Sequence, residues 1–214
     1  MDGKQDSASA LLALDDLTRR LRRECPWDRE QDERTIVPHT VEEAYELADA
    51  AFSGDDAKLV DELGDVLFQV HFLSLLLEER DAGSLAEVAE HCRQKLIRRH
   101  PHVFSDVEVS DAGEVLANWD EIKKGEDGRE PGIFGEVPEN LPALLYARKV
   151  QRRAKTAGVD VVAPKPSGPA EDELGDRLFA LVDEARRQKI DPELALRRAA
   201  DRFRARVQID EEQS

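Results

Sequence analysis

The chain of 214 residues is long enough for one ordinary domain with a buried core, or for one and a half. Charged residues make up 36% and aromatic residues only 5%, which favours a helical protein and disfavours a large β-sheet. The 47 acidic and 31 basic residues give a net charge of −16, which disfavours nucleic-acid binding because it repels a phosphate backbone. Neither a membrane-spanning apolar stretch nor a secretory leader is visible in the sequence. We therefore expect a cytoplasmic protein.

Apolar residues at helical spacing predict five helices in the first 125 residues. The first is expected to end at Cys25-Pro26-Trp27, and a polar loop is expected to run from there to Pro38. Ser84-x-x-Glu87 has the pattern of a capping box, and Asp111 can cap a further helix. The predicted helices cover about 8–23, 40–53, 57–80, 84–100 and 111–125.

The predicted helix 57–80 is apolar on nearly every side of its second half. Leu63, Val66 and Val70 belong to one stripe, and Phe72 lies on the other side. A helix that is apolar all round usually lies at the centre of its bundle, so we expect this one to be central. In the next helix we expect Cys92 to face inward.

A short motif occurs twice in the chain. Glu62–Phe68 (ELGDVLF) returns as Glu173–Phe179 (ELGDRLF), with six identities in seven positions. Arg202-x-x-x-Arg206 likewise echoes Lys95-x-x-x-Arg99. Two matching elements in the same order indicate an internal repeat.

The second copy of this repeat is incomplete. Residues 151–170 contain no glutamate and include a Pro/Gly-rich stretch, so the counterpart of the helix 40–53 is missing. The predicted organisation is a complete domain at 1–125, a connection with a helix and a linker at 126–169, and a truncated second repeat at 170–214.

Acidic residues lie symmetrically about the turn at Gly54. Because a short turn joins two antiparallel helices, residues at equal distances from the turn come to the same height. With helix axes roughly 8–10 Å apart, four carboxylates can converge on one place. The four are Glu46 and Glu62, each eight residues from Gly54, and Glu43 and Asp65, each eleven residues from it.

Four carboxylates in one place repel one another and stay ionised only where cations compensate them. Oxygen ligands without a nearby His or Cys select Mg²⁺ or Mn²⁺ over zinc. A di-iron site would need Glu-x-x-His, which the sequence lacks. The alternative is an ordinary solvated acidic helix face. The spacing leaves both open, and the symmetry about Gly54 favours the metal site.

Four motifs in this order resemble the MazG family. They are Cys25-Pro26-Trp27-Asp28, Glu42-Glu43-x-x-Glu46, Glu62-Leu63-Gly64-Asp65 and Arg98–Phe104 (RRHPHVF). The resemblance covers residues 8–125 and continues from Leu141 to Gly158, as in the connection of a tandem protein. It implies an all-α helical bundle related to the dimeric dUTPases.

The resemblance also implies an activity. Members of this family hydrolyse nucleoside triphosphates to nucleoside monophosphate and pyrophosphate with Mg²⁺, for which Mn²⁺ is a possible substitute. Their sites lie at or near a dimer interface, so a homodimer is implied. The expected role is nucleotide-pool house-cleaning.

Specific residues match the family's motifs. Matching positions imply that Glu43, Glu46, Glu62 and Asp65 are metal ligands, that Lys95 and Arg99 bind the triphosphate, and that Trp119 and Lys123 lie near the nucleotide. Glu42 is a candidate general base or orienting residue.

Other interpretations stay open. Lys95 and Arg99 also suit the negative end of a helix dipole, and Trp119 could be a core residue. A protein of another class, a nucleotide-binding regulatory or interaction protein without turnover, could have evolved from a tandem enzyme. A purely structural acidic protein is the third alternative, and the intact acidic motifs disfavour it.

Overall fold

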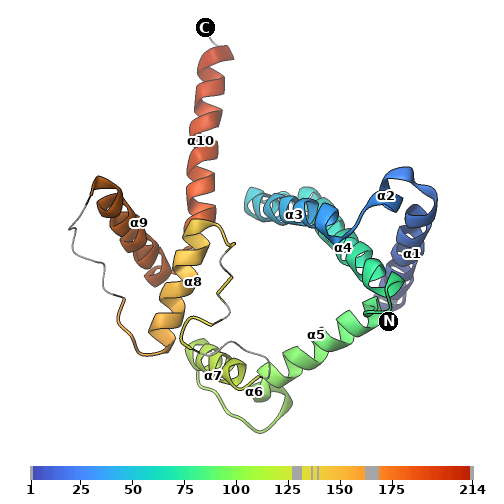
Figure 1. Ribbon diagram of the computed structural model, residues 1–214, viewed down its shortest axis with the longest axis horizontal. Helices are drawn as coiled ribbons and strands as arrows, with labels where there is room; N and C mark the ends of the chain where they lie inside the picture. The colour runs from blue at the N-terminus through green and yellow to red at the C-terminus, as the bar shows by residue number, and fades with distance from the viewer. Residues whose placement is uncertain (1, 127–131, 136, 139, 162–168, 213–214) are drawn as a thin grey trace. The chain divides into compact units, whose positions relative to one another are not determined.

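The computed structural model describes residues 2–126, 132–135, 137–138, 140–161 and 169–212. These residues form α-helices and their connections, without a strand among them, which confirms the all-α prediction (Figure 1). No helix in these ranges is long and apolar enough to cross a bilayer. The helices are α1 (Asp2–Glu24), α2 (Pro26–Glu30), α3 (Glu33–Ser53), α4 (Asp56–Glu79), α5 (Leu85–Arg99), α6 (Pro101–Phe104), α7 (Ala112–Lys124), α8 (Ala143–Thr156), α9 (Ala170–Arg187) and α10 (Pro192–Glu212).

The chain divides into two compact units, Met1–Arg98 and Arg99–Ser214. The predicted helix within the connection 126–169 is present as α8, while residues 127–131 and 162–168 of that connection lie outside the described residues. The predicted domain division at 125 and 170 stays a prediction.

The start of α3 differs from the prediction near Thr40. The Asp32 carboxylate accepts a hydrogen bond from the Thr35 backbone N–H at 2.9 Å, and the Thr35 hydroxyl accepts one from the Asp32 N–H at 2.9 Å. This reciprocal cap begins the helix at Glu33. Pro38 therefore lies inside α3, and the expected polar loop before it is replaced in part by the short helix α2.

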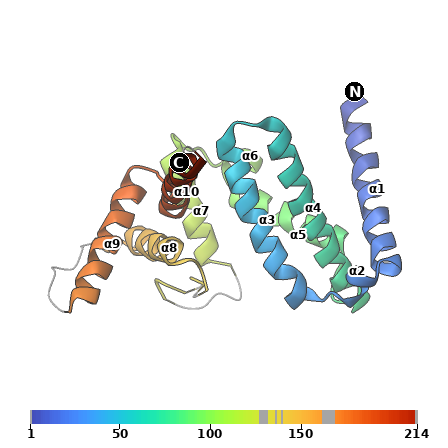
Figure 2. The ribbon, with the colours of Figure 1, turned by 90° about the horizontal axis from the view of Figure 1, so that it is seen from above.

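Helices α3 and α4 form an antiparallel hairpin, as predicted (Figure 2). Gly54 makes the turn with φ 73°, a left-handed conformation that glycine adopts without a steric cost. The Asp55 side chain then caps α4. At the other end of the hairpin Ile36 packs with Phe72 and Leu76, all nearly fully buried. This core holds the two helices in register.

Helix α1 lies along α4 and is held there by two paired arginine–carboxylate contacts. Arg19 donates to both oxygens of Glu78 at 3.0 and 2.6 Å. Arg22 donates to both oxygens of Glu79 at 2.8 Å. These ion pairs fix α1 against the end of α4 that lies farthest from the Gly54 turn.

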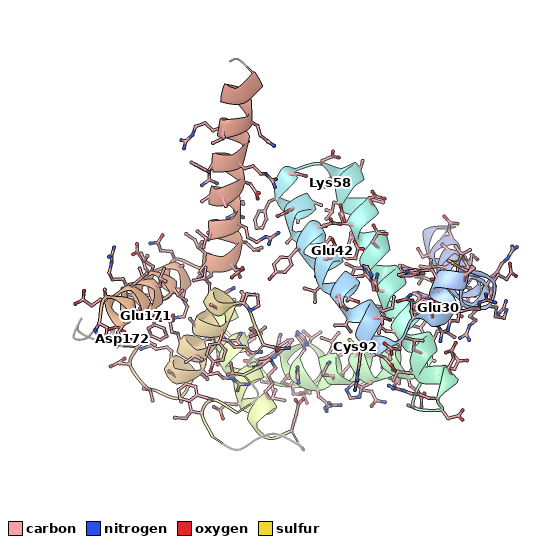
Figure 3. The ribbon with its side chains drawn as sticks, turned by 45° about the horizontal axis from the view of Figure 1, so that its top comes forward. Glu30, Glu42, Lys58, Cys92, Glu171 and Asp172 are labelled. Carbon is pink, nitrogen blue, oxygen red and sulfur yellow. The ribbon has the colours of Figure 1, made fainter. Side chains whose placement is uncertain are left out.

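Helix α4 contacts both α1 and α3, as expected of a central helix, but it is not covered on every side. Leu63 and Val70 are exposed, whereas Phe72 and Leu75 are buried. Helix α5 has no buried residue, and its Cys92, expected to face inward, is exposed (Figure 3). The sequence pattern located the apolar faces correctly but did not determine which of them the rest of the chain covers.

The second unit contains a packed group of helices in which α8 contacts α9 and α10. The Gln151 side chain of α8 is fully buried and donates to the Phe179 carbonyl of α9 at 2.7 Å. Ala154 and Val182 are buried in the same group of helices. One face of α8 is thereby fixed against its neighbours.

Candidate functional site

Three carboxylates from the two arms of the α3–α4 hairpin come together. One oxygen each of Glu43, Glu62 and Asp65 lies within 4.8 Å of the other two. Glu43 is on α3, whereas Glu62 and Asp65 lie one turn apart on α4. We call these three residues the acidic cluster. Among the residues that the structure describes, this is the one group with a spacing suited to a metal ion.

The negative charges of the acidic cluster lie close together and repel one another. Burial raises the pKa of Glu43, and the charges of Asp65, Glu46 and Glu62 raise it further. The pKa of Glu62, a buried residue, is likewise raised by burial and then by Glu46. Carboxylates in such surroundings are stabilised by a bound cation. Their oxygen donors fit a hard divalent ion such as Mg²⁺.

The two other glutamates of the α3 motif lie outside the acidic cluster. Glu46 acts on it through space, because its charge raises the pKa of both Glu43 and Glu62. Glu42 is exposed on α3, with one carboxylate oxygen 3.7 Å from His39 Nδ1 (Figure 3). The Glu42 side chain therefore contacts a residue of its own helix and lies outside the acidic cluster.

A cation beside the acidic cluster was missed in the sequence. Lys58 precedes Glu62 by one turn of α4, and its charge lowers the pKa of that glutamate (Figure 3). Lys58 also lines an open hollow of about 640 Å³ together with Gly64 and Asp65. The spacing of four residues between Lys58 and Glu62 was the available signal.

Gly64 lines this hollow without adding a side chain to it. A Cβ atom built on Gly64 would meet nothing within 4 Å. The glycine therefore leaves space above the backbone between Leu63 and Asp65. A ligand or another helix can approach the acidic cluster closely from this side.

Three of the four basic and aromatic residues singled out from the sequence meet in the second unit. The Arg99 guanidinium lies 5.8 Å, and the Lys123 ammonium 5.7 Å, from the centre of the Trp119 ring. Both distances are typical of cation–π contacts. Lys95 is half-buried one turn before Arg99 on α5, in the first unit.

Two partners of this group were not foreseen. Glu126 accepts from Arg99 through both carboxylate oxygens, at 3.0 and 2.5 Å. The edge of the His100 ring faces Trp119 with 4.7 Å between ring centres. Neither contact follows from local sequence patterns, because each joins residues far apart in the chain.

The second copy of the repeat does not rebuild the acidic cluster. Its Glu173 and Asp176 lie on α9, whose first turn also carries Glu171 and Asp172 (Figure 3). Among the described residues, no third carboxylate lies in metal-binding range of this pair. This agrees with the predicted truncation of the second copy, because in the first copy α3 supplies Glu43.

Comparison with known proteins identifies relatives over most of the chain. The MazG nucleotide pyrophosphohydrolase domain matches residues 31–104. A nucleoside triphosphate pyrophosphohydrolase of Escherichia coli (strain K12) is 36% identical over 206 residues, covering 85% of this chain and 78% of that protein. The nucleoside triphosphate pyrophosphohydrolase/pyrophosphatase MazG of Thermotoga maritima is 36% identical over 206 residues, covering 88% and 79%. A crystal structure of a mazG-related protein from Thermotoga maritima is 26% identical, with a TM-score of 0.46, and covers 52% of this chain and 97% of that one.

The matched domain covers both arms of the α3–α4 hairpin and therefore every residue of the acidic cluster. The fold and this domain define an all-α hydrolase. The chain belongs to the MazG family of nucleotide pyrophosphohydrolases.

Proposed function

We propose that this protein hydrolyses nucleoside triphosphates to a nucleoside monophosphate and pyrophosphate, with Mg²⁺ as the metal and Mn²⁺ as a substitute. The observation that carries the proposal is the acidic cluster, in which three carboxylate oxygens lie within 4.8 Å of one another. The names of the relatives from E. coli and Thermotoga maritima support the reaction.

The residues of the acidic cluster hold the metal in this proposal. Glu43, Glu62 and Asp65 supply oxygen ligands, and Glu46 adds a fourth carboxylate after a side-chain movement. A bound divalent cation would stabilise the negative charge that develops on the phosphates during cleavage. Lys58, on the edge of the hollow beside Asp65, offers a positive charge to the same phosphates.

The basic and aromatic residues bind the substrate in this proposal. Lys95 and Arg99 contact the phosphates, since a guanidinium can bind two phosphate oxygens at once. The Trp119 ring offers an apolar surface to the nucleotide, and Lys123 adds a positive charge. Glu42 is exposed and is not one of the metal ligands in this proposal. It is the candidate general base, or it orients the acidic cluster.

A homodimer completes the proposal. Helix α4 exposes Val60, Leu63, Leu67 and Val70, and the last three lie at the spacing of one helix face. This apolar face adjoins the acidic cluster, because Leu63 lies between Glu62 and Asp65 in the sequence. A second copy of the chain would remove the apolar face from water. The biological role that fits is removal of unwanted nucleotides from the cytoplasmic pool.

The test is a product assay with a panel of canonical and modified nucleoside triphosphates. We expect monophosphate and pyrophosphate in the presence of Mg²⁺ and neither with a chelator. Glu62→Gln should lower kcat/KM by about 100-fold or more, because it removes one ligand without removing the side-chain volume. Glu173→Gln, at the matching position of the second copy, is the control and should keep full activity.

Other products would contradict the proposal. Release of diphosphate and phosphate would mean that a different phosphoanhydride bond is cleaved. Full activity of Glu62→Gln would place the reaction outside the acidic cluster.

A second candidate function is nucleotide binding without turnover. The predicted truncation of the repeat favours it. Glu173 and Asp176 of the second copy have no third carboxylate in metal-binding range among the described residues. In that case calorimetry would detect nucleotide binding while the assay with Mg²⁺ yields no product.

A further inference from the structure

Helix α8 is positively charged, in contrast to the chain as a whole. Its 14 residues, ALLYARKVQRRAKT, contain five basic residues and no acidic one, whereas the whole chain has a net charge of −16. In a protein of this charge an anion binds only where cations locally outnumber carboxylates. Helix α8, in the second unit of the chain, offers cations for such a place, although Arg148 and Lys155 pair with Asp191 and Asp160.

A cavity of about 320 Å³ lies along one face of this helix. Leu145, Arg148, Lys149 and Arg152 recur at spacings of three, four or seven, which places them on the same side of α8. Leu141, which precedes the helix, completes the lining. The cavity falls within the size range of small-molecule sites.

Packing holds this cavity in place. On another side of α8, Gln151 and Ala154 are buried, and Gln151 donates a hydrogen bond to the Phe179 carbonyl of α9. The Arg148 guanidinium is bonded to Asp191, whose other oxygen accepts from the Leu194 N–H at the start of α10. The lining helix is therefore positioned by both of its neighbours. Asp191 offsets the charge of Arg148, and Lys149 also has an interaction partner.

The lining changes from apolar to cationic along the axis of α8. Leu141 and Leu145 form an apolar end, and Arg148, Lys149 and Arg152 form a cationic end. Leu145 and Arg152 are seven residues apart, a rise of about 10 Å. A ligand that fits both ends is elongated, with several negative charges at one end.

We propose that this cavity on α8 binds a polyphosphate group, either that of a nucleoside triphosphate or free inorganic pyrophosphate. Arg152 and Lys149 hold the phosphate oxygens, and the two leucines accept the apolar part of a nucleotide. This site is positively charged, whereas the acidic cluster is negatively charged. The two sites share no residue, and this one needs no metal. It does not depend on the proposed hydrolysis, because binding at cationic side chains occurs without turnover.

The test measures binding to the full chain by calorimetry in excess EDTA, with inorganic pyrophosphate and with ATP as separate probes. We expect Arg152→Ala and Lys149→Ala each to raise the Kd by about tenfold, since each removes a charge-assisted contact. Lys155→Ala is the matched control on the same helix, because Lys155 pairs with Asp160 and does not line the cavity. Circular dichroism checks that every variant is folded.

An Arg99→Ala background separates this site from the proposed substrate-binding residues. In that background Arg152→Ala should still raise the Kd by about tenfold. ATP binding that is tighter than pyrophosphate binding in the same background identifies a nucleotide as the ligand, and equal affinities identify the polyphosphate alone. The proposal fails if neither probe binds in the Arg99→Ala background, if Arg152→Ala has no effect there, or if Lys155→Ala weakens binding as much as Arg152→Ala.

Discussion

At the scale of single residues, Glu62 combines burial with like-charged neighbours. Burial and the charge of Glu46 both raise its pKa, so the ionised carboxylate is unfavourable in the folded protein without a cation. A bound divalent ion would reverse that effect. If Glu62 binds a metal as proposed, it does so at a cost to the stability of the metal-free protein.

One conservative substitution measures how the charge of Glu62 affects the stability of the metal-free protein. In EDTA at neutral pH, Glu62→Gln should raise the midpoint of thermal unfolding, because it removes a buried negative charge. Added Mg²⁺ should stabilise the unsubstituted protein and leave the variant nearly unchanged. Glu173→Gln, at the matching position of the second copy, is the control. An unchanged midpoint in EDTA would show that the charge of Glu62 is already neutralised.

Glu126 occupies the guanidinium of Arg99 through both carboxylate oxygens. A phosphate that binds Arg99 must compete with this carboxylate for the same donors. If Arg99 contacts the substrate as proposed, Glu126→Gln should lower the KM for nucleotide by a few-fold, roughly 1 kcal/mol, with little change in kcat. Steady-state kinetics checks it.

Glu90→Gln is the matched control for this substitution. Glu90 forms a similar two-oxygen pair with Arg93 on the same helix as Arg99, and neither residue belongs to the proposed site. A rise in KM for Glu126→Gln would show instead that the carboxylate positions Arg99 for the substrate.

At the scale of helices, ion pairs fasten α1 to α4. Arg22 lowers the pKa of Glu79 below its usual 4.5 through two hydrogen bonds. A carboxylate with a lowered pKa in the folded state adds stability above its unfolded pKa, and this stability disappears as the pH falls through the lowered value.

The expected size is modest because the Glu79 side chain is 40% exposed. Glu79→Gln should reduce the free energy of unfolding by less than about 1 kcal/mol at pH 7, and by nothing measurable at pH 2. Urea unfolding at the two pH values measures the difference. Glu24→Gln is the control, since Glu24 pairs with Arg20 within α1 and joins no second helix. A loss that is equal at both pH values would show that charge is not the cause.

At the scale of the whole molecule, the exposed apolar face of α4 predicts self-association. Leu67→Lys should convert a dimer to a monomer, because a lysine ammonium buried against an apolar surface is strongly unfavourable. Light scattering coupled to gel filtration measures the mass. Leu12→Lys, which changes an exposed leucine of α1, should leave the mass unchanged. A monomeric unsubstituted protein would refute the proposed homodimer.

Much of the first unit could be predicted from the sequence. The α3–α4 hairpin follows from helical periodicity and from a left-handed turn at Gly54, which are properties of neighbouring residues. The convergence of Glu43 with Asp65 follows from the same two properties, since both lie eleven residues from the turn. Glu46 lies as far from the turn as Glu62 and is nevertheless outside the acidic cluster. The start of α3 was also within reach, because Asp32 and Thr35 form a local cap that the sequence analysis overlooked.

Contacts between distant segments could not be predicted in this way. Periodicity marks two apolar sides on α4, and only the packing of α1 and α3 decides that Phe72 is buried while Leu63 is exposed. The pairing of Arg99 with Glu126 depends on how the chain returns after α7. The sequence by itself determined the helices and the heights of the acidic residues, because both depend on local geometry. The tertiary structure alone decided burial and long-range partners, because these depend on which surfaces meet in space.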